Sequence, residues 1–280
     1  MKRGEGREED DGMQWLELTS EDFEQAVRRA DGLCLLPFGA VERHGPHLPI
    51  GADQITADAV ARAAAEEEPA VVFPSYCLGK IFTARHYAGT LALTRRLLLP
   101  LLEATVEEIA RNGFDRILIV NGHGGNRSLL HFFLRSLLEE PRDYVVYASD
   151  YYEMEEGPRR MWHEMRASDY GGHADEMETS MMLHVRPDLV DMDLVPEVED
   201  GLSRGRTADL PGLSTSISWY ADHPTHYAGD AREATPEKGA FMFRACVEKV
   251  VRQMRAIKAD EMSPALQQEF YRRSDHSGAP

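Results

Sequence analysis

Between Glu42 and Asp53 the chain carries four side chains that can bind metal ions, Glu42, His44, His47 and Asp53. Glu42 and His44 are two positions apart, so an extended backbone would point both side chains the same way. Glycine and proline at positions 45, 46, 49 and 51 exclude a helix between them. The segment is therefore predicted to be a loop whose side chains converge on a metal ion.

A second segment of this kind, Asn121–Asn126, contains His123 and follows the apolar run 116–120. In open α/β sheets, ligands bind beyond the carboxyl ends of the strands, where loops from neighbouring strands face each other. Glu42, His44, Asp53 and His123 would then form an oxygen and nitrogen ligand set without thiolates, which suits Zn²⁺, Mn²⁺ or Fe²⁺. Asp53 is expected to bridge two such ions, as hydrolytic sites with two metals require.

A third group of acidic residues lies at 173–178 and contains His173, Asp175, Glu176 and Glu178. On a helix, His173 and Glu176 would share a face, whereas Glu178 would lie on a different side of the helix from Glu176. One of the two glutamates is expected to complete the metal shell, and the choice between them stays open at this point. His173 is a candidate general acid or base.

The remaining histidines are expected to be structural or solvated, namely His47, His131, His163, His184, His223, His226 and His276. Gly124 and Gly125 precede a helix, but neither the lysine of a phosphate-binding loop nor a dinucleotide fingerprint accompanies them. A nucleotide site is therefore not expected. Tyr76, His86 and Gly124 are predicted to contact a small-molecule substrate.

Strands and helices alternate along the sequence, which favours an α/β fold with a mostly parallel central sheet. Strands are predicted at 33–37, 71–73, 116–120 and 144–148, with a short strand at 91–93, and helices at 20–29, 53–68, 94–112, 127–140, 173–184 and 235–259. We expect a single domain over residues 13–260, a disordered acidic tail at 1–12 and a C-terminal tail at 261–280.

Composition narrows the classes of partner. The formal charge of −17, from 31 basic and 48 acidic residues, argues against nucleic acid and anionic lipid, which need a basic surface. No apolar run is long enough to span a membrane, and no signal peptide is recognised at the start. Three widely spaced cysteines, Cys34, Cys77 and Cys246, fit reduced thiols, so a cytoplasmic location is expected.

Taken together, these motifs resemble those of the creatininase (creatinine amidohydrolase) family. The matching segments are Glu42–Pro49 with Asp53, Asn121–Asn126 and His173–Ser180; His86–Thr90 and the stretch from Ala228 to Gly239 resemble two further family motifs. The resemblance covers roughly residues 15 to 255, in the family's order.

The resemblance implies a three-layer α/β/α sandwich, two divalent metal ions per subunit (Zn, Mn or Fe) and a homo-oligomer, often a hexamer. Glu42 and His123 would bind one ion, His44 the other, Asp53 would bridge them, and His173 would sit beside the substrate. Creatininase itself has a glutamate ligand at the position of Gly125, so Glu176 is expected to supply the missing carboxylate. This departure puts creatinine specificity in doubt.

The function predicted on this basis is hydrolysis of a cyclic or linear amide C–N bond by a water that two divalent ions activate, with His173 and Glu176 as catalytic residues. The alternatives within the family are hydrolysis of a keto-inositol or another carbohydrate ring, and deformylation of a formamide. A metal-binding protein without activity is the non-enzymatic alternative.

Overall fold

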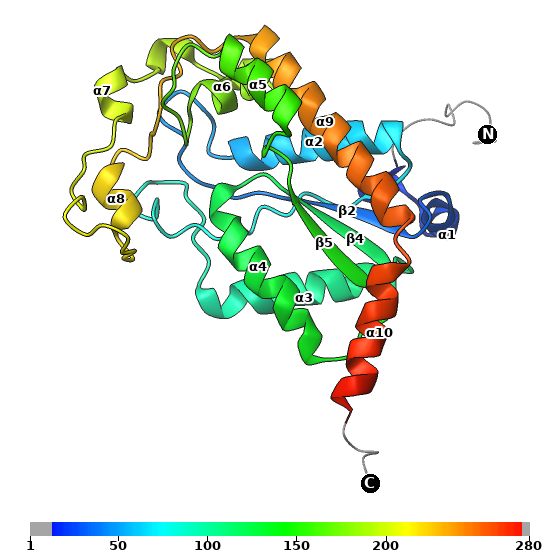
Figure 1. Ribbon diagram of the computed structural model, residues 1–280. Coiled ribbons are helices and arrows are strands. Elements are labelled where there is room, and N and C mark those ends of the chain that lie inside the picture. Colours follow the sequence, from blue (N-terminus) through cyan, green and yellow to red (C-terminus); the bar gives the residue numbers. More distant parts are fainter. Residues whose placement is uncertain (1–12, 276–280) are drawn as a thin grey trace.

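Five parallel strands form the central sheet within residues 13–275, which are the residues that the computed structural model describes. The strands lie in the order β1-β3-β2-β4-β5. Figure 1 labels β2, β4 and β5. Their bounds are β1 Met13–Gln14, β2 Leu33–Phe38, β3 Val71–Val72, β4 Arg116–Asn121 and β5 Val145–Asp150. The prediction of a parallel sheet is confirmed, and its two central long strands, β2 and β4, are the apolar runs that lead into the predicted metal loops.

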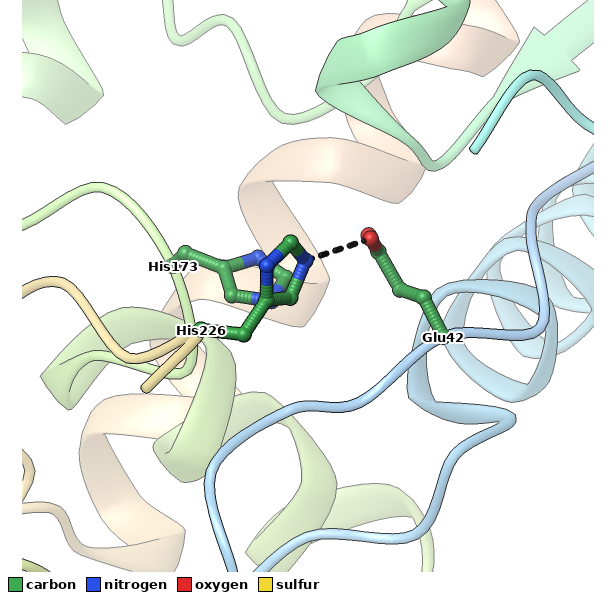
Figure 2. A group of neighbouring side chains, drawn as sticks. All are labelled: Glu42, His173 and His226. Atoms are coloured by element: carbon green, nitrogen blue, oxygen red, sulfur yellow. Dashed lines mark hydrogen bonds and ion pairs between the residues drawn. The ribbon is translucent and has the colours of Figure 1, made fainter. Parts of the chain in front are cut away.

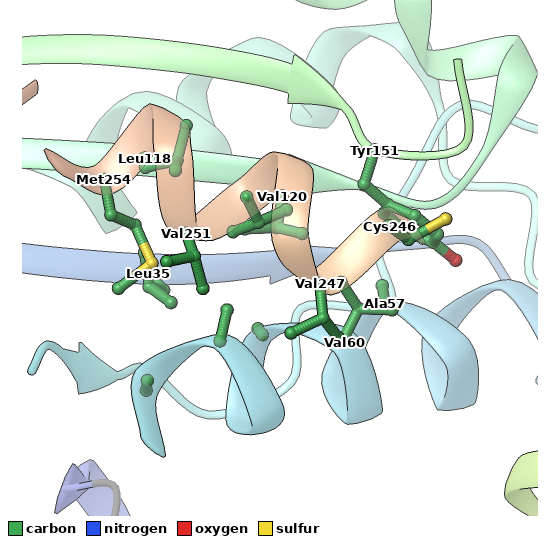
Figure 3. Packing of buried hydrophobic residues seen from close by; sticks show 14 of the residues in the cluster. Leu35, Ala57, Val60, Leu118, Val120, Tyr151, Cys246, Val247, Val251 and Met254 are labelled. Atoms are coloured by element: carbon green, nitrogen blue, oxygen red, sulfur yellow. The ribbon is translucent and has the colours of Figure 1, made fainter. Parts of the chain in front are cut away.

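Helices cover both faces of the sheet because the central strands are apolar on both sides. Leu35 and Leu118 face α2 (Ala52–Glu67) and α9 (Pro236–Lys258), whose side chains meet them in one core (Figure 3). Leu36 and Ile117 face the opposite core, which includes residues of α1 (Ser20–Arg29), α3 (Arg95–Arg111) and α4 (Arg127–Ser136). The fold is the expected three-layer α/β/α sandwich (Figure 1).

Threonines cap three of these helices, within one residue of the predicted helix starts. The hydroxyl oxygens of Thr19, Thr94 and Thr235 accept hydrogen bonds from backbone N–H groups in the first turns of α1, α3 and α9. α9 also has Pro236 in its first turn, where the missing N–H costs no hydrogen bond. These local signals explain why the helix starts were predictable.

The helix predicted at 173–184 begins later than expected, as α6 (Glu176–Val185). Asp175 is its N-cap, because the Asp175 carboxylate accepts hydrogen bonds from the backbone N–H groups of Met177 and Glu178. His173 therefore precedes the helix, and the predicted helical face shared by His173 and Glu176 does not exist. α6 packs closely on α9, where a Cβ on Gly239 would lie 1.8 Å from the Ser180 carbonyl oxygen.

Three further segments differ from the prediction. Residues 91–93 form no strand. The irregular connection after β5 contains α5 (Glu156–Met165), and the following loops contain the short helices α7 (Val198–Gly201) and α8 (Ser218–Asp222). The expected C-terminal tail holds α10 (Met262–Ser274), which is attached to the domain because Gln267 donates hydrogen bonds to the Arg142 and Tyr144 carbonyls. The predicted tail at 1–12 lies outside the described residues.

Among residues 13–275, none of the helices combines the length and the apolar composition needed to cross a bilayer.

Candidate metal centre and active site

Two loops that follow β2 and β4 meet at the start of α2. Asp53 lies in the first turn of α2, and Gly122 lies directly after β4. A Cβ on Gly122 would come within 2.6 Å of the Asp53 carbonyl oxygen, so this close approach requires glycine. The contact places His123, the next residue, beside the Asp53 side chain.

Glu42, His44 and Asp53 form one buried cluster with His123, which lies 70 positions further along the chain than Asp53, as the topology led us to expect. Asp53 Oδ1 lies 2.9 Å from His44 Nε2, and Asp53 Oδ2 lies 2.9 Å from His123 Nδ1. Glu42 Oε1 also lies 2.9 Å from His123 Nδ1. Two carboxylate oxygens thus converge on a single ring nitrogen.

Backbone carbonyls orient His44 and His123, because each contacts the ring nitrogen that faces away from the carboxylates. His44 Nδ1 lies 3.2 Å from the Glu42 carbonyl oxygen, and His123 Nε2 lies 3.2 Å from that of Lys80. Because a carbonyl can only accept, these ring nitrogens carry the hydrogen, and the opposite nitrogens face the carboxylates. Metal-binding histidines in proteins are characteristically held in this way.

The carboxylates favour a positive charge at this point. Burial lowers the pKa of His44, but the neighbouring Asp53 carboxylate more than offsets this and raises it to about 10. Burial also opposes protonation of His123, yet Glu42 and Asp53 raise its pKa well above the ordinary value. Glu42 Oε1 and Asp53 Oδ2 are buried without a hydrogen-bond partner. Such oxygens, beside nitrogens held for ligation, fit divalent cations.

His173 approaches the cluster from the segment before α6. Its backbone N–H and C=O both pair with Ala228, and its Nε2 lies 2.8 Å from the Arg43 carbonyl oxygen. The hydrogen is therefore on Nε2, and Nδ1 presents a lone pair 4.0 Å from Glu178 Oε2. Burial, followed by the neighbouring charge of His44, lowers the pKa of His173 to about 3, which keeps the ring neutral.

Glu178, and not Glu176, brings a further carboxylate to the cluster. Glu178 Oε2 lies 3.8 Å from His44 Nε2. Glu176 instead points away, because its carboxylate accepts hydrogen bonds from the backbone N–H groups of Ala167 and Ser168 and forms an ion pair with Lys238. The expectation that Glu176 is a metal ligand and a catalytic residue is therefore corrected. The position of the helix start explains this difference, because it turns the buried side chain of Glu176, the first residue of α6, away from the cluster.

His226 is a member of the site that the sequence did not reveal. We expected it to be structural or solvated, but it is buried and its Nε2 lies 2.9 Å from Glu42 Oε2 (Figure 2). The His173 ring lies next to it, with ring centroids 4.7 Å apart (Figure 2). Trp219, on α8, donates its indole N–H to His226 Nδ1 at 3.1 Å. No local motif marks His226, because its partner Glu42 is 184 residues away.

A cavity of about 850 Å³ opens on this cluster. Gly124 lines the cavity, and its contact with a substrate stays a prediction. Tyr76 does not: its bridge to Phe38 turns the ring into the core beneath the sheet, so its assignment to the substrate is corrected. His86 lines a neighbouring hollow that shares Phe82, Thr83 and Ser216 with the cavity.

Two relatives resemble this chain over most of its length. Creatinine amidohydrolase of Pseudomonas putida is 28% identical over 249 residues, which cover 84% of this chain and 93% of the relative. A mycofactocin precursor peptide peptidase of Mycobacterium ulcerans (strain Agy99) is 31% identical over 229 residues, covering 78% of this chain and 82% of the relative.

The fold comparison agrees with the sequence comparison. A solved mutant creatininase of Zn–Zn type superposes with a TM-score of 0.73 at 26% identity, covering 88% of this chain and 98% of the other. The family model described as creatinine amidohydrolase matches residues 16–254, which include all the cluster residues described above. This protein therefore belongs to the creatininase family of hydrolases.

Proposed function

We propose that this protein hydrolyses an amide C–N bond with the help of two divalent cations, Zn²⁺, Mn²⁺ or Fe²⁺. The observation that carries the proposal is the pair of buried oxygens, Glu42 Oε1 and Asp53 Oδ2, both 2.9 Å from His123 Nδ1 and both without a hydrogen-bond partner. A single ring N–H shared between two carboxylate oxygens satisfies neither of them fully, whereas one cation can bind all three atoms.

The side chains divide into two overlapping ligand groups. Glu42, Asp53 and His123 would hold one ion. His44 and Glu178, which form a group with His173, would hold the other, together with the second oxygen of Asp53, which contacts His44. Glu42, His173 and His226 form a third group beside these two. Glu178 would thus replace the glutamate that creatininase has at the position of Gly125. A Cβ on Gly125 would lie 2.3 Å from His123 Nε2, so a side chain there conflicts with the present His123 orientation.

Divalent cations at these positions would polarise an amide carbonyl and lower the pKa of a water molecule toward neutrality. The protein side chains would transfer the protons. His173 Nδ1, whose lone pair faces the cavity, can take a proton from the attacking water and return it to the leaving nitrogen. The Arg43 carbonyl keeps the His173 ring in the tautomer that this role requires.

The cavity wall points to an amide with an apolar substituent. Met177 of α6 presents partly exposed surface to it, next to Met181, Met182 and Met242, which are buried beneath the wall. Methionine side chains pack well against apolar groups of varied shape, but they leave the hydroxyl groups of a sugar or keto-inositol unpaired. The cavity is also larger than a creatinine-sized ligand needs. We therefore favour a linear, peptide-like amide over a carbohydrate ring or a small formamide.

A substrate panel on metal-loaded protein tests this proposal. Zn²⁺- or Mn²⁺-loaded enzyme is expected to hydrolyse N-acyl amides or short peptides with apolar side chains faster than creatinine, formamides or keto-inositols. Product release would be followed by chromatography. Turnover of a keto-inositol without turnover of any amide would overturn the amide assignment while leaving the metal centre in place. The family resemblance further predicts a cytoplasmic homo-oligomer, with a hexamer as the expected size in light scattering.

A further inference from the structure

The histidines around the cluster differ in the group that contacts the ring nitrogen facing away from the carboxylates. His44, His123 and His173 each have a backbone carbonyl behind the ring, so each turns its other ring nitrogen toward the carboxylates. His226 has the indole N–H of Trp219 behind it, 3.1 Å from Nδ1. An indole nitrogen can only donate a hydrogen bond, so Nδ1 of His226 must accept it.

The tautomer of His226 follows from this contact. With its lone pair on Nδ1 engaged by Trp219, the ring carries its hydrogen on Nε2 and donates it to Glu42 Oε2 at 2.9 Å. We propose that His226 is a positioning residue: with Trp219 it holds one oxygen of Glu42 and leaves Oε1 aimed at the ion that His123 also binds. The proposal rests on the proposed metal-dependent function.

The backbone around His226 is fixed on both sides, which keeps its ring in place. His226 has a φ of 56°, a left-handed conformation that non-glycine residues seldom adopt. Arg43 Nε donates to the Thr225 carbonyl at 3.1 Å, and the Tyr87 hydroxyl donates to the Pro224 carbonyl at 3.0 Å. Two residues beyond His226, Ala228 pairs with His173. The chain thus holds His226 Nε2 against Glu42, in a group with His173 whose spacing would also admit an ion. The contact with Trp219 favours the role of hydrogen-bond donor for this nitrogen.

The consequence is a selective effect on one ion. Without the donor, Glu42 Oε2 would be buried without a partner, and the carboxylate would be free to rotate away from His123. Loss of a residue that orients a metal ligand typically weakens metal affinity by about 10- to 100-fold. The ion bound by His44 and Glu178 does not depend on this contact.

Nitrogen NMR of the wild-type protein tests the tautomer directly. In protein with ¹⁵N-labelled histidine, the metal-free and the Zn²⁺-loaded states should both show His226 with a protonated Nε2 and an unprotonated Nδ1. Trp219→Phe keeps an aromatic ring but removes the indole donor, so His226 should then populate both tautomers. A wild-type His226 protonated on Nδ1 alone would overturn the proposal.

Two substitutions separate the donor from the bulk of the ring. His226→Phe keeps the ring shape without a donor, and its stepwise Zn²⁺ affinities would be measured by competition with a chromophoric chelator. One affinity is expected to fall about 10- to 100-fold and the other to stay unchanged. His226→Gln, whose amide can donate to Glu42, should recover most of the loss. His131→Phe and His131→Gln, at an exposed position of α4, are the matched controls.

The outcomes separate this proposal from the proposed function. Unchanged affinities in His226→Phe would overturn the positioning role, and equal losses in the Phe and Gln variants would show that His226 is itself a ligand. Wild-type protein that binds two ions but hydrolyses no amide would overturn the proposed function alone, because the positioning role is judged by affinity and tautomer.

Discussion

His44 and His123 contact opposite oxygens of one carboxylate, that of Asp53. His44 Nε2 lies 2.9 Å from Oδ1, and His123 Nδ1 lies 2.9 Å from Oδ2. A carboxylate held between two such nitrogens has the arrangement required to bridge two ions. The fold creates it by bringing the loop after β2, the loop after β4 and the start of α2 to one point.

Replacing Asp53, the proposed bridging residue, tests this arrangement. Asp53→Asn keeps the shape of the side chain but removes the negative charge that two cations would share. Because loss of a residue that merely orients a ligand costs about 10- to 100-fold, kcat should fall at least 100-fold in this variant. Its metal content, measured by elemental analysis, should drop below two ions per chain. Full activity with both ions retained would contradict the bridging role.

Glu178→Gln and Glu176→Gln should have opposite effects. Glu178→Gln is expected to lose the ion that His44 binds, with little change in the stability of the metal-free protein. Glu176→Gln should keep both ions but lower the free energy of unfolding by roughly 3 kcal/mol, because the mostly buried Lys238 loses its charged partner. Elemental analysis and urea unfolding would measure both properties. Loss of metal in Glu176→Gln alone would restore our original assignment.

Removal of metal should abolish activity reversibly. Dialysis against a strong chelator is expected to inactivate the enzyme, and Zn²⁺ or Mn²⁺ should restore it, whereas Mg²⁺ should restore less because imidazole ligands suit it poorly. Bound ions should also raise Tm, since a ligand at 100 times its Kd stabilises the native state by about 2.7 kcal/mol. Activity that persists in protein verified to be metal-free would exclude metal-dependent hydrolysis.

The methionine wall should control substrate choice. Met177→Gln places an amide on the wall at a partly exposed position of the cavity. kcat/KM for an amide with an apolar substituent should fall about 10-fold or more, mainly through KM, while the metal content stays unchanged. Equal effects on apolar and polar substrates would show that this wall does not discriminate between substituents.

The attachment of α10 should depend on pH through Asp260. Its carboxylate accepts hydrogen bonds from the Met262 and Ser263 backbone N–H groups and from the Tyr147 hydroxyl. Hydrogen bonds from Ser263 lower the pKa of Asp260 to about 2 from 3.8. The charged form therefore stabilises the fold above about pH 4, and this contribution is lost as the pH falls through about 2.

Asp260→Asn should accordingly melt at a lower temperature than the wild type above about pH 4, and the difference should shrink toward pH 2. Thermal unfolding of both proteins across this range would measure it. A difference that does not change with pH would show that the charge of Asp260 is irrelevant to α10.

The layers of the fold and four residues of the site were predictable because they follow from local patterns. Apolar runs mark β2 and β4, and threonine caps mark three helix starts. Glu42, His44, Asp53 and His123 lie in loops at the carboxyl ends of those strands or directly after them, where parallel topology brings loops together. α10 was missed because it is an otherwise exposed helix with no buried residues.

The local sequence could not distinguish Glu176 from Glu178 as the residue that reaches the cluster. Both lie on the same helix, and they differ only in the direction in which their side chains point. Asp175 sets the start of α6, and this start turns Glu176 toward Lys238 and leaves Glu178 facing His44. For His226 the decisive contact is with Glu42, far away along the chain. The sequence by itself determined the chemistry of the ligands and the strands that carry them, because both are local properties. Only the tertiary structure decided which side chains reach the cluster and which ring nitrogen of each histidine carries the hydrogen. Both depend on contacts between distant segments.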